Sequence, residues 1–468
     1  MSEIKFGTDG WRAIIARDFT EANVARVSEA VAQWLIKNEK SPSVVIGHDC
    51  RFAGELFMEA AARVFASKGI RVFYGKGFVS TPMVSLGTKV IQASMGIVIT
   101  ASHNPPSYNG YKLKGSYGGP LLPDKIAEIE ALIPAQSTLL DKAESFEKYE
   151  RAELIKEVPL EDMYVEHVEK NFDLALIRKS GMIPAYDAMY GAGQNVVKRL
   201  FPDAVRLHCD YNPSFMGQAP EPIARNLREF SSLIKQKGNI SCGLATDGDA
   251  DRIGLFGPDG NFVDSHHIIL LLIKYLVEEK KMKGKVVTAF SVTPRVKKMC
   301  EHFGLEYEVV KIGFKYIAGI MISEDVLLGG EESGGIAIKG HIPERDGLWM
   351  GFVVWEYMAR SGKKLGDLIN DLYQITGPFA FERSDLHLTE AEKNKVIEKC
   401  QNNKFSAFGS YKVEKVETID GWKYYFANDE WLMIRASGTE PVLRTYAESY
   451  SQENAFKILE AAKKEMLA

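Results

Sequence analysis

The 468-residue sequence has few cysteines, no long hydrophobic run and no large excess of either charge. Its five cysteines lie far apart and form no C-x-x-C pair, which disfavours a thiolate metal site or redox pair and is typical of a reducing compartment. The longest apolar cluster, Ile268 to Ile273, is far shorter than the roughly 20 residues of a membrane span, and the first residues contain no apolar signal core. The formal net charge of −4 disfavours a general binder of nucleic acid or of membrane surfaces. We therefore expect a cytoplasmic protein that gathers small ligands locally.

Two common catalytic signatures are also missing. No G-x-S-x-G elbow is present, which disfavours an α/β-hydrolase. Gly191-Ala192-Gly193 begins like a dinucleotide-binding turn, but the position three beyond Gly193 is Val196, where glycine or alanine is required. A Rossmann oxidoreductase is therefore disfavoured, and any nucleophile in this chain must be activated by other means.

Short apolar runs rich in β-branched residues alternate with helical patterns, which is the signature of βαβ sheets. The length suggests about three domains, with four if they are small. The composition becomes charged and helical from Ile126 to about Asp162, where the first boundary is expected, and Gly377-Pro378 marks the last. The predicted strands, unit by unit, are 44–47, 70–74 and 95–99; 183–186, 205–207, 240–245 and 253–256; 286–288, 307–310 and 326–328; and 411–413, 422–426 and 431–434. The clearest predicted helices are 21–37, 55–68 and 452–466.

The serine at position 102 directly follows the apolar strand pattern 95–99. Its loop contains His103 and Asn104, whose side chains bond local backbone, and the residue before Pro105 is biased away from helix. The strand must therefore end in a structured loop, and in an open α/β sheet that carboxyl end is where ligands bind. We interpret Ser102 as a nucleophile, with a simple loop cap as the alternative.

Three carboxylates, those of Asp247, Asp249 and Asp251, share one short loop at the end of another strand pattern. Carboxylates at this spacing can converge on a hard divalent cation, and oxygen-only ligands beside a phosphate favour Mg²⁺. An EF-hand is excluded because the sixth position is Arg252 instead of glycine and the twelfth is Pro258 instead of glutamate. The alternative is a solvated run of charge.

Two basic residues could serve an anionic ligand near this loop. Arg12 follows a glycine-spaced turn that can hold its guanidinium against an anion, although the same pattern fits an ordinary hairpin turn. Lys112 comes a few residues after Ser102 and could donate or accept a proton if burial and nearby positive charge lower its pKa.

Two glycine-containing segments later in the chain carry polar groups suited to a sugar phosphate. The segment Gly329 to Gly335 contains Glu331 and Ser333 between glycines. A carboxylate and a hydroxyl together can bind vicinal sugar hydroxyls, but the same residues fit a glycine-rich turn with capping acids equally well. The segment 435–441 offers a guanidinium, two hydroxyls and free amides, which match the oxygens of a phosphate dianion.

Together these motifs resemble the α-D-phosphohexomutase superfamily, the phosphoglucomutase/phosphomannomutase family, over nearly the whole chain. The motifs that carry the resemblance stand in the family's order, as Gly7 to Arg12, Thr100 to Pro105, Asp247 to Arg252, Gly330 to Gly334 and Arg435 to Pro441. The resemblance implies three related mixed-sheet α/β domains plus a smaller α+β C-terminal domain around a central active-site cleft. The expected divisions are 1–145 with the phosphoserine, 146–255 with the metal site, 256–376 with the sugar site and 377–468 with the phosphate site.

By this resemblance Ser102 is the family's phosphoserine, which makes the chain a phosphoprotein. Ser102 and the three aspartates are the implied ligands of Mg²⁺. Arg12 and Arg252 would steady the phosphoryl group, and Lys112 with His103 would form the acid/base set. The residues implied in substrate binding are Gly313, Glu331, Ser333, Arg435, Ser437, Gly438 and Thr439.

The implied activity is that of an isomerase of carbohydrate metabolism. It is an intramolecular phosphotransfer that interconverts hexose 1-phosphate and hexose 6-phosphate through the phosphoserine, with hexose 1,6-bisphosphate as intermediate and activator. Glu331-Glu332-Ser333 resembles the glucose-type branch, so glucose phosphate is favoured. Phosphomannomutase and phosphoglucosamine mutase are the alternatives, because the segment 435–441 also approaches the phosphoglucosamine pattern.

One position departs from the family pattern. Some members carry a histidine after the Lys-x-Gly of the third domain, whereas Lys311-Ile312-Gly313 is followed here by Phe314. The sequence therefore does not identify the second proton-transfer group, for which Lys315 is only a weak substitute. A non-catalytic sugar-phosphate-binding protein is the alternative from another class, but it would be expected to have lost Ser102 or an aspartate. The expected partners are small sugar phosphates, without nucleic acid or membrane, and the expected state is a monomer or homodimer.

Overall fold

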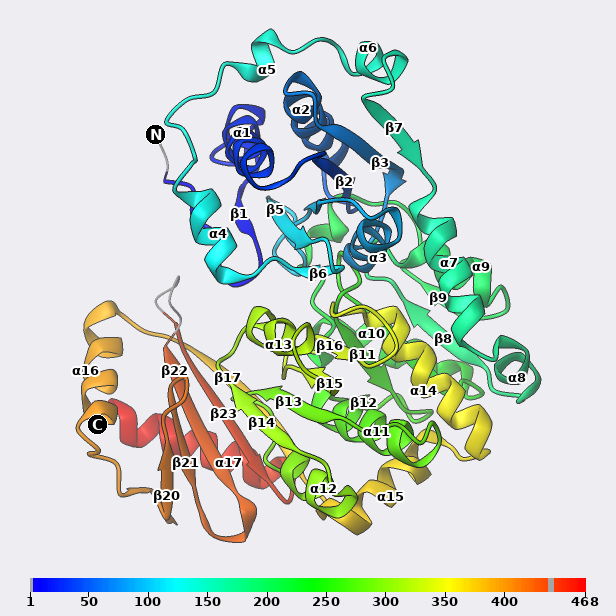
Figure 1. Cartoon of the computed structure of the whole chain (residues 1–468). Coiled ribbons are helices and arrows are strands. Elements are labelled where there is room, and N and C mark those ends of the chain that lie inside the picture. Colours follow the sequence, from blue (N-terminus) through cyan, green and yellow to red (C-terminus); the bar gives the residue numbers. More distant parts are fainter. Residues whose placement is uncertain (1–2, 437–441) are drawn as a thin grey trace.

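The computed structural model describes residues 3–436 and 442–468. These residues form four main sheets that follow one another along the chain, together with a small two-stranded sheet. Figure 1 shows the first sheet and its helices at the top, the second and third units below it, and the C-terminal sheet at the lower left. The predicted fold class, three mixed α/β units followed by a smaller α+β unit, is confirmed.

The first sheet has the strand order β1-β5-β4-β2-β3-β7, with β6 beside β5. Its centre is parallel and fully buried, and the edge formed by β5 and β1 is antiparallel. The strands are β1 (Trp11–Ile14), β2 (Ser43–His48), β3 (Arg71–Phe78), β4 (Met95–Ile99), β5 (Tyr108–Gly115), β6 (Gly119–Pro120) and β7 (Ile155–Val158). The helices of this part are α1 (Glu21–Asn38), α2 (Gly54–Ser67), α3 (Thr81–Ile91), α4 (Pro123–Glu130), α5 (Leu139–Lys142) and α6 (Phe146–Arg151).

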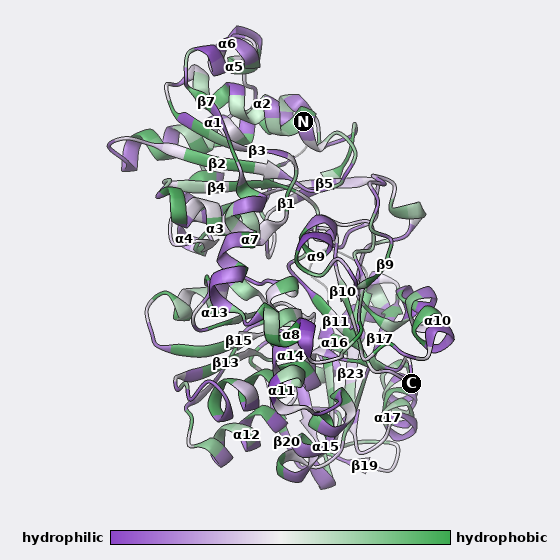
Figure 2. Cartoon of the chain, turned by 90° about the vertical axis from the view of Figure 1, so that its right-hand side faces the viewer, coloured by the Kyte–Doolittle hydropathy of each residue, from purple (hydrophilic) through white to green (hydrophobic). Residues whose placement is uncertain are grey.

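Local sequence explains why these elements form. The side chain of Thr20 accepts a hydrogen bond from the Asn23 amide and caps α1, whose first turn carries Glu21 and whose last turn carries Lys37. These charges complement the helix dipole, so the helix boundaries match the pattern predicted for 21–37. Figure 2 shows the interior strands β2 and β4 as largely hydrophobic, whereas the outlying helices α6 and α10 (Arg228–Lys237) are strongly hydrophilic.

The second and third sheets have the orders β12-β11-β10-β8-β9 and β14-β13-β15-β16. The second unit contains α7 (Leu160–Asn171), α8 (Leu174–Lys179), β8 (Pro184–Asp187), α9 (Gln194–Leu200), β9 (Val205–Leu207), α10, β10 (Cys242–Thr246), β11 (Ile253–Phe256) and β12 (Phe262–Val263). The third contains α11 (Ser265–Glu278), β13 (Lys285–Ala289), α12 (Arg295–Phe303), β14 (Tyr307–Val310), α13 (Phe314–Met321), β15 (Val326–Gly330), β16 (Ile336–Ile338), α14 (Gly347–Ser361) and α15 (Leu365–Thr376).

The apolar run Ile268 to Ile273 lies within α11, where every residue from Ser265 to Leu276 is buried. This helix packs against α12, α14 and α15 and against strands of both the second and the third sheet. A helix that is apolar on all sides needs such complete cover. Among the described residues, no helix has both the length and the apolar character needed to cross a membrane.

The fourth sheet is antiparallel throughout, in the order β17-β23-β22-β21-β20. Its elements are β17 (Ala380–His387), α16 (Glu390–Gln401), β20 (Lys415–Glu417), β21 (Trp422–Tyr425), β22 (Trp431–Ala436), β23 (Val442–Ser449) and α17 (Gln452–Leu467), with β18 (Ala407–Phe408) and β19 (Tyr411–Lys412) forming the two-stranded sheet. The strand β7 lies beyond residue 145 and β12 lies beyond residue 255, so the first two sheets extend past the expected domain boundaries, which otherwise stay predictions.

Lys423 in β21 lies where the fourth sheet meets the third. Its Nζ donates hydrogen bonds to the carbonyl oxygens of Phe290, at 3.2 Å, and Val292, at 2.9 Å. The same atom lies 3.9 Å from the centroid of a Trp431 ring, within reach of a cation–π interaction. Burial lowers the pKa of Lys423 to about 7, although Glu448 acts in the opposite direction. The folded protein therefore binds the Lys423 proton much more weakly than the unfolded chain does.

Replacing Lys423 with methionine should flatten the pH dependence of stability between about pH 7 and pH 10. Over this range the unfolded chain carries the Lys423 proton and the folded protein does not, so unfolding takes up a proton and the free energy of unfolding rises with pH. One proton corresponds to at most about 1.4 kcal/mol per pH unit. Urea titrations at the two ends of this range, followed by tryptophan fluorescence, measure the slope. Lys404→Met, at an exposed position, should keep the parent slope. An unchanged slope in Lys423→Met would contradict the lowered pKa of Lys423 in the folded protein.

Candidate active site

Ser102 lies in the loop between β4 and β5, at the carboxyl end of the buried strand β4. Its side chain is buried, and its Oγ donates a hydrogen bond to Oδ2 of Asp247 at 2.7 Å. The backbone of Ser102 has a φ of +53°, in the left-handed region that serine rarely adopts. The loop thus places Oγ against a carboxylate of the second unit.

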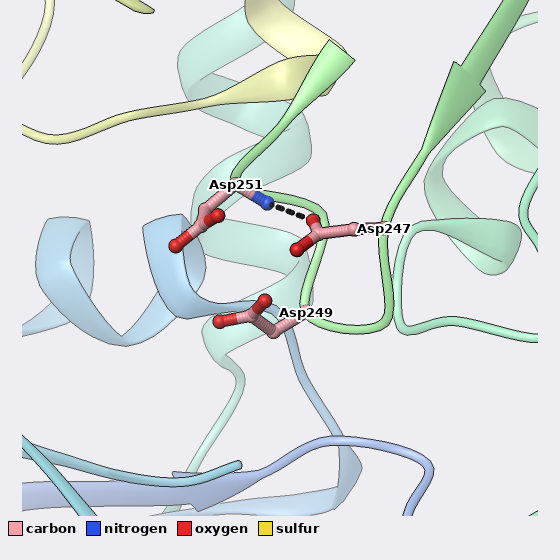
Figure 3. A group of neighbouring side chains, drawn as sticks. All are labelled: Asp247, Asp249 and Asp251. Atoms are coloured by element: carbon pink, nitrogen blue, oxygen red, sulfur yellow. Dashed lines mark hydrogen bonds between the residues drawn. The ribbon is translucent and has the colours of Figure 1, made fainter. Parts of the chain in front are cut away.

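The three predicted aspartates occupy the loop between β10 and β11, and all are buried. They offer carboxylate oxygens that lie within 4.8 Å of one another (Figure 3). The loop is shaped by the Asp247 Oδ1 atom, which accepts hydrogen bonds from the amides of Asp251, at 2.9 Å, and Arg252, at 3.1 Å. The sequence prediction that these carboxylates converge is therefore confirmed by their geometry.

The donor set of this loop fits a hard divalent cation. Oδ1 of Asp249 and Oδ1 of Asp251 are buried and have no hydrogen-bond partner among the described residues. Burial, followed by the charges of Asp249 and Asp251, raises the pKa of Asp247 well above its usual range. Buried oxygens without partners are unfavourable, and a bound cation would satisfy them while relieving the repulsion.

Lys112, on β5, faces the same carboxylates. Its Nζ lies 2.8 Å from Asp9, 2.7 Å from Asp249 and 2.9 Å from Asp251. Burial lowers the pKa of Lys112, but the three carboxylates more than offset this effect and raise the pKa above its usual value. The condition under which Lys112 could exchange a proton, a pKa lowered by burial and positive neighbours, is not met, because the neighbours are mainly anionic. Lys112 therefore stands between these carboxylates as an ammonium that neutralises charge.

Arg12, Arg252 and His103 complete the surroundings of Ser102. Arg12 Nη1 donates a hydrogen bond to Asn104 Oδ1 at 2.7 Å, on the loop that carries Ser102. His103 Nδ1 lies 3.3 Å from Ser102 Oγ. Burial, and then the charges of Arg252 and Arg12, lowers the pKa of His103 well below its usual range. The imidazole is consequently neutral in this environment.

The predicted sugar-binding loop connects β15 to β16. Glu331 Oε1 accepts a hydrogen bond from the Gly313 amide at 2.9 Å, and burial raises the pKa of Glu331. Gly313 has a φ of +132°, and a Cβ there would lie 2.9 Å from the Thr8 side chain, so only glycine fits. Ser333 lines a cavity of about 900 Å³ whose walls come from the second, third and fourth units.

The predicted phosphate site lies only in part within the described residues. Arg435, at the end of β22, stands opposite Arg444 of β23 in the sheet register. Arg435 lies 3.5 Å from Asp420, and Arg444 lies 3.7 Å from Asp385. The neighbouring candidates Ser437, Gly438 and Thr439 lie outside the described residues.

Arg345 is a site residue that the sequence did not predict. Arg345 is buried just before α14, with its guanidinium against Asp9 and 2.6 Å from Asp251. Its Cζ also lies 5.5 Å from the ring of Phe314, the residue found where some family members have histidine. The only signal in the sequence was a charged triplet, Glu344 to Asp346, before an apolar helix. Lys315, the suggested substitute for that histidine, lines a separate cavity of about 140 Å³ together with Asp9.

Comparison with known protein families gives one consistent result along the chain. Four families described as phosphoglucomutase/phosphomannomutase match in order: alpha/beta/alpha domain I at residues 3–139, domain II at 162–260, domain III at 264–376 and the C-terminal domain at 386–465.

Relatives and solved structures agree with these matches. A phosphoglucomutase/phosphomannomutase of Thermococcus kodakarensis is 29% identical over 461 residues, covering 97% of this chain and 96% of its own. A phosphoglucosamine mutase of Halalkalibacterium halodurans is 28% identical and covers 98% of both chains. The crystal structure of a Thermus thermophilus protein assigned as a phosphomannomutase superposes with a TM-score of 0.88, at 31% identity and with 100% of both chains covered.

Proposed function

Because this chain belongs to the phosphoglucomutase/phosphomannomutase family and is a phosphohexomutase, we propose that it interconverts glucose 1-phosphate and glucose 6-phosphate through a phosphoserine at Ser102. The hexose 1,6-bisphosphate serves as intermediate and activator. The observation that carries this proposal is the buried Ser102 Oγ, 2.7 Å from Asp247 and beside the three-aspartate loop. A serine used only as a loop cap would have no need of this surrounding.

The transfer requires no covalent partner besides Ser102. The phosphoserine gives its phosphoryl group to the O6 hydroxyl of a hexose 1-phosphate, so the Ser102 O–P bond breaks as the O6–P bond forms. The proton of the O6 hydroxyl passes to Ser102 Oγ through an acid/base group, for which neutral His103 is the nearest candidate. The bisphosphate then reorients in the site, so that its 1-phosphate faces Ser102. The O1–P bond breaks as a new Ser102 O–P bond forms, and the Ser102 hydroxyl proton passes to O1, which leaves the hexose 6-phosphate.

Charge neutralisation is the main task of the site, because phosphoryl transfer depends on positioning and electrostatics. Asp247, Asp249, Asp251 and an oxygen on Ser102 would hold Mg²⁺, which supplies electrostatic stabilisation of the transferring group when bound. Arg12 and Arg252 would face the phosphoryl oxygens from the other side. Lys112 would remain protonated between the carboxylates and the transferring group.

The sugar is held, in this proposal, between two separate groups of residues. Glu331, Ser333 and the Gly313 amide region would bind the hydroxyls, and the cavity beside Ser333 is large enough for a hexose phosphate. Arg435, with Ser437, Gly438 and Thr439, would bind the phosphate that does not react. Closure of the fourth unit over this cavity would exclude water, which otherwise hydrolyses the phosphoserine.

Glucosamine phosphate is a second candidate substrate, favoured by the phosphoglucosamine mutases among the similar proteins. Values of kcat/KM for glucose, mannose and glucosamine 1-phosphates, each with a trace of its bisphosphate, separate the candidates. We expect the highest value for glucose 1-phosphate. A higher value for glucosamine 1-phosphate or mannose 1-phosphate would replace the glucose assignment, and no turnover of any of the three would contradict the proposed activity.

Gly248 lets the aspartate loop approach Ser102 closely, which yields a further prediction. A Cβ at Gly248 would lie 2.6 Å from the Ser102 carbonyl oxygen, so Gly248→Ala should push the two loops apart. Since misplacement by about 1 Å can cost about 100-fold in rate, we expect kcat to fall by a factor of that order. Gly366→Ala is the matched control, because its Cβ meets no atom within 4 Å, and it should keep parent activity. Parent kcat in Gly248→Ala would show that the close approach is not needed.

A further inference from the structure

We propose that Asp49 and Arg51, at the end of β2, form a clamp that fixes the backbone on both sides of Ser102 and thereby sets the rate of phosphoryl transfer. The hydrogen bonds of Ser102 Oγ within the described residues go to neither side chain, and neither side chain was singled out by the sequence or by the family resemblance. We call this pair the Asp49–Arg51 clamp. The inference rests on the proposed role of Ser102 and adds two positioning residues to it.

The carbonyl side of the loop is held by Arg51, a residue that is 1% exposed. Its Nη2 donates hydrogen bonds to the carbonyl oxygens of Ser102 and Asn104, both at 2.6 Å. Its Nη1 donates to the carbonyl oxygens of Pro105, at 2.9 Å, and Tyr108, at 3.0 Å. One buried guanidinium therefore binds four carbonyl groups between Ser102 and the start of β5.

The amide side of Ser102 is held by Asp49, which is fully buried. Asp49 Oδ2 accepts a hydrogen bond from Thr100 Oγ1 at 2.5 Å, and Thr100 Oγ1 in turn accepts one from the Ser102 amide at 2.9 Å. Asp49 Oδ1 accepts from the Arg51 amide at 2.9 Å, and Asp49 Oδ2 lies 3.3 Å from Arg51 Nε. The two residues thus share one network that reaches Ser102 from both directions.

The backbone conformation of Ser102 explains why such a clamp is needed. A φ of +53° is unfavourable for a residue with a Cβ and persists only where the surroundings determine it. In the proposed cycle Ser102 loses its phosphoryl group and regains one from a different sugar oxygen, so Oγ has to occupy the same place in both half-reactions. A loop free to relax to negative φ would move Oγ away from Asp247.

Arginine is suited to this task in a way that lysine is not. The guanidinium is planar and offers five N–H donors in fixed directions, whereas an ammonium offers three donors from one atom. Lysine at position 51 could keep the charge next to Asp49 but could not bind four carbonyl groups spread along the loop. Arg51→Lys therefore separates the geometric role from the charge.

The test compares Arg51→Lys, Arg51→Ala and Asp49→Asn with the parent and with Arg71→Lys, whose arginine is exposed on β3. Steady-state turnover of glucose 1-phosphate with a trace of glucose 1,6-bisphosphate gives kcat and KM. Quenched mixing with the bisphosphate, followed by intact-mass analysis, gives the rate of Ser102 phosphorylation. We expect kcat and the phosphorylation rate to fall together by about 100-fold in Arg51→Lys and by about 10-fold in Asp49→Asn. KM should change by less than about threefold in both, because the clamp contacts no substrate-binding residue.

Added guanidinium ion at millimolar concentration should restore at least about 10-fold of the kcat lost in Arg51→Ala, since it can refill the site left by the side chain. A parent-like kcat in Arg51→Lys, or a loss expressed in KM instead of kcat, would overturn the clamp. If Arg51→Ala fails to fold, the kcat and KM values of Arg51→Lys and Asp49→Asn decide whether the clamp sets the transfer rate. Absence of phosphorylation on Ser102 in the parent would instead refute the proposed function, so the two failures are distinguishable.

Discussion

Replacing Ser102 with alanine is expected to lower kcat for the conversion of glucose 1-phosphate to glucose 6-phosphate by a factor of about 10⁴ or more. Ser102 Oγ faces the three-aspartate cluster, so its removal deletes the proposed phosphoryl carrier itself. The groups proposed to bind the sugar lie on other loops and remain in place. Substrate affinity, measured by calorimetric titration of glucose 1-phosphate, should therefore change by less than about threefold.

Ser107→Ala is the matched control for this variant. Ser107 lies on the same loop but is exposed to solvent, and its replacement should leave kcat near the parent value. Turnover by Ser102→Ala at more than about one hundredth of the parent rate would contradict a route through phosphoserine. A general loss of substrate binding would show instead that the substitution disturbs the loop.

Removal of divalent cations is expected to stop turnover completely, and addition of Mg²⁺ should restore it. Without a cation, Asp249 Oδ1 and Asp251 Oδ1 are buried without hydrogen-bond partners among the residues that the structure describes. The transferring phosphoryl group would then face uncompensated carboxylates. Asp249→Asn should lower kcat by a factor of about 100 or more and should raise the Mg²⁺ concentration needed for half-maximal activity.

Asp259→Asn is the control for the metal prediction, because Asp259 is an exposed aspartate in the hairpin that follows the same loop. It should require the same Mg²⁺ concentration as the parent. The stability of the loaded and the cation-free protein supplies a second readout, since a cation that binds only the folded state raises the melting temperature. Full activity after exhaustive dialysis against a chelator would contradict the role given to the three aspartates.

Much of the fold followed from local sequence. The strands β4, β9, β11 and β14 begin and end at the predicted residues, because short β-branched runs bounded by polar or glycine-containing turns leave few alternatives. The charged stretch after Ile126 was less readable. It contains β7, which pairs with β3 over Ile155 to Val158, and the two consecutive charged residues Lys156 and Glu157 at its centre break the alternation that marks a half-buried strand.

Candidate site residues could be predicted from the sequence where several reactive or charged side chains share one short segment. Ser102 lies in the loop after the buried strand β4, and Asp247, Asp249 and Asp251 lie in the loop after the buried strand β10, so each falls at the carboxyl end of a strand of its own sheet, where ligands bind. Arg51 and Arg345 were not predicted from the sequence, because their partners are distant along the chain. Arg51 binds carbonyl groups about fifty residues away, and Arg345 contacts Asp251 from another unit. A single arginine in sequence gives no indication of such contacts.

The electrostatics of the site depended even more on tertiary structure. The pKa of Lys112 is raised because Asp9, Asp249 and Asp251 surround it, whereas its own segment contains no acidic residue. Only the assembled units could determine the direction of that shift. The same holds for His103, whose pKa is lowered by desolvation and by the charges of Arg252 and Arg12, two residues from other segments of the chain.

Phosphorylation of Ser102 during turnover can be measured by mass spectrometry. The protein is incubated with Mg²⁺ and glucose 1,6-bisphosphate, quenched and digested, and the peptide containing Ser102 is analysed before and after addition of excess glucose 1-phosphate. When the bisphosphate carries isotopically labelled phosphoryl groups, we expect one labelled phosphoryl group on Ser102 that passes to the added sugar and is replaced by the unlabelled 1-phosphoryl group, so that the label leaves Ser102 while the peptide stays phosphorylated. An active enzyme in which Ser102 stays unmodified, or a phosphoryl group on Ser102 that does not transfer, would contradict this expectation.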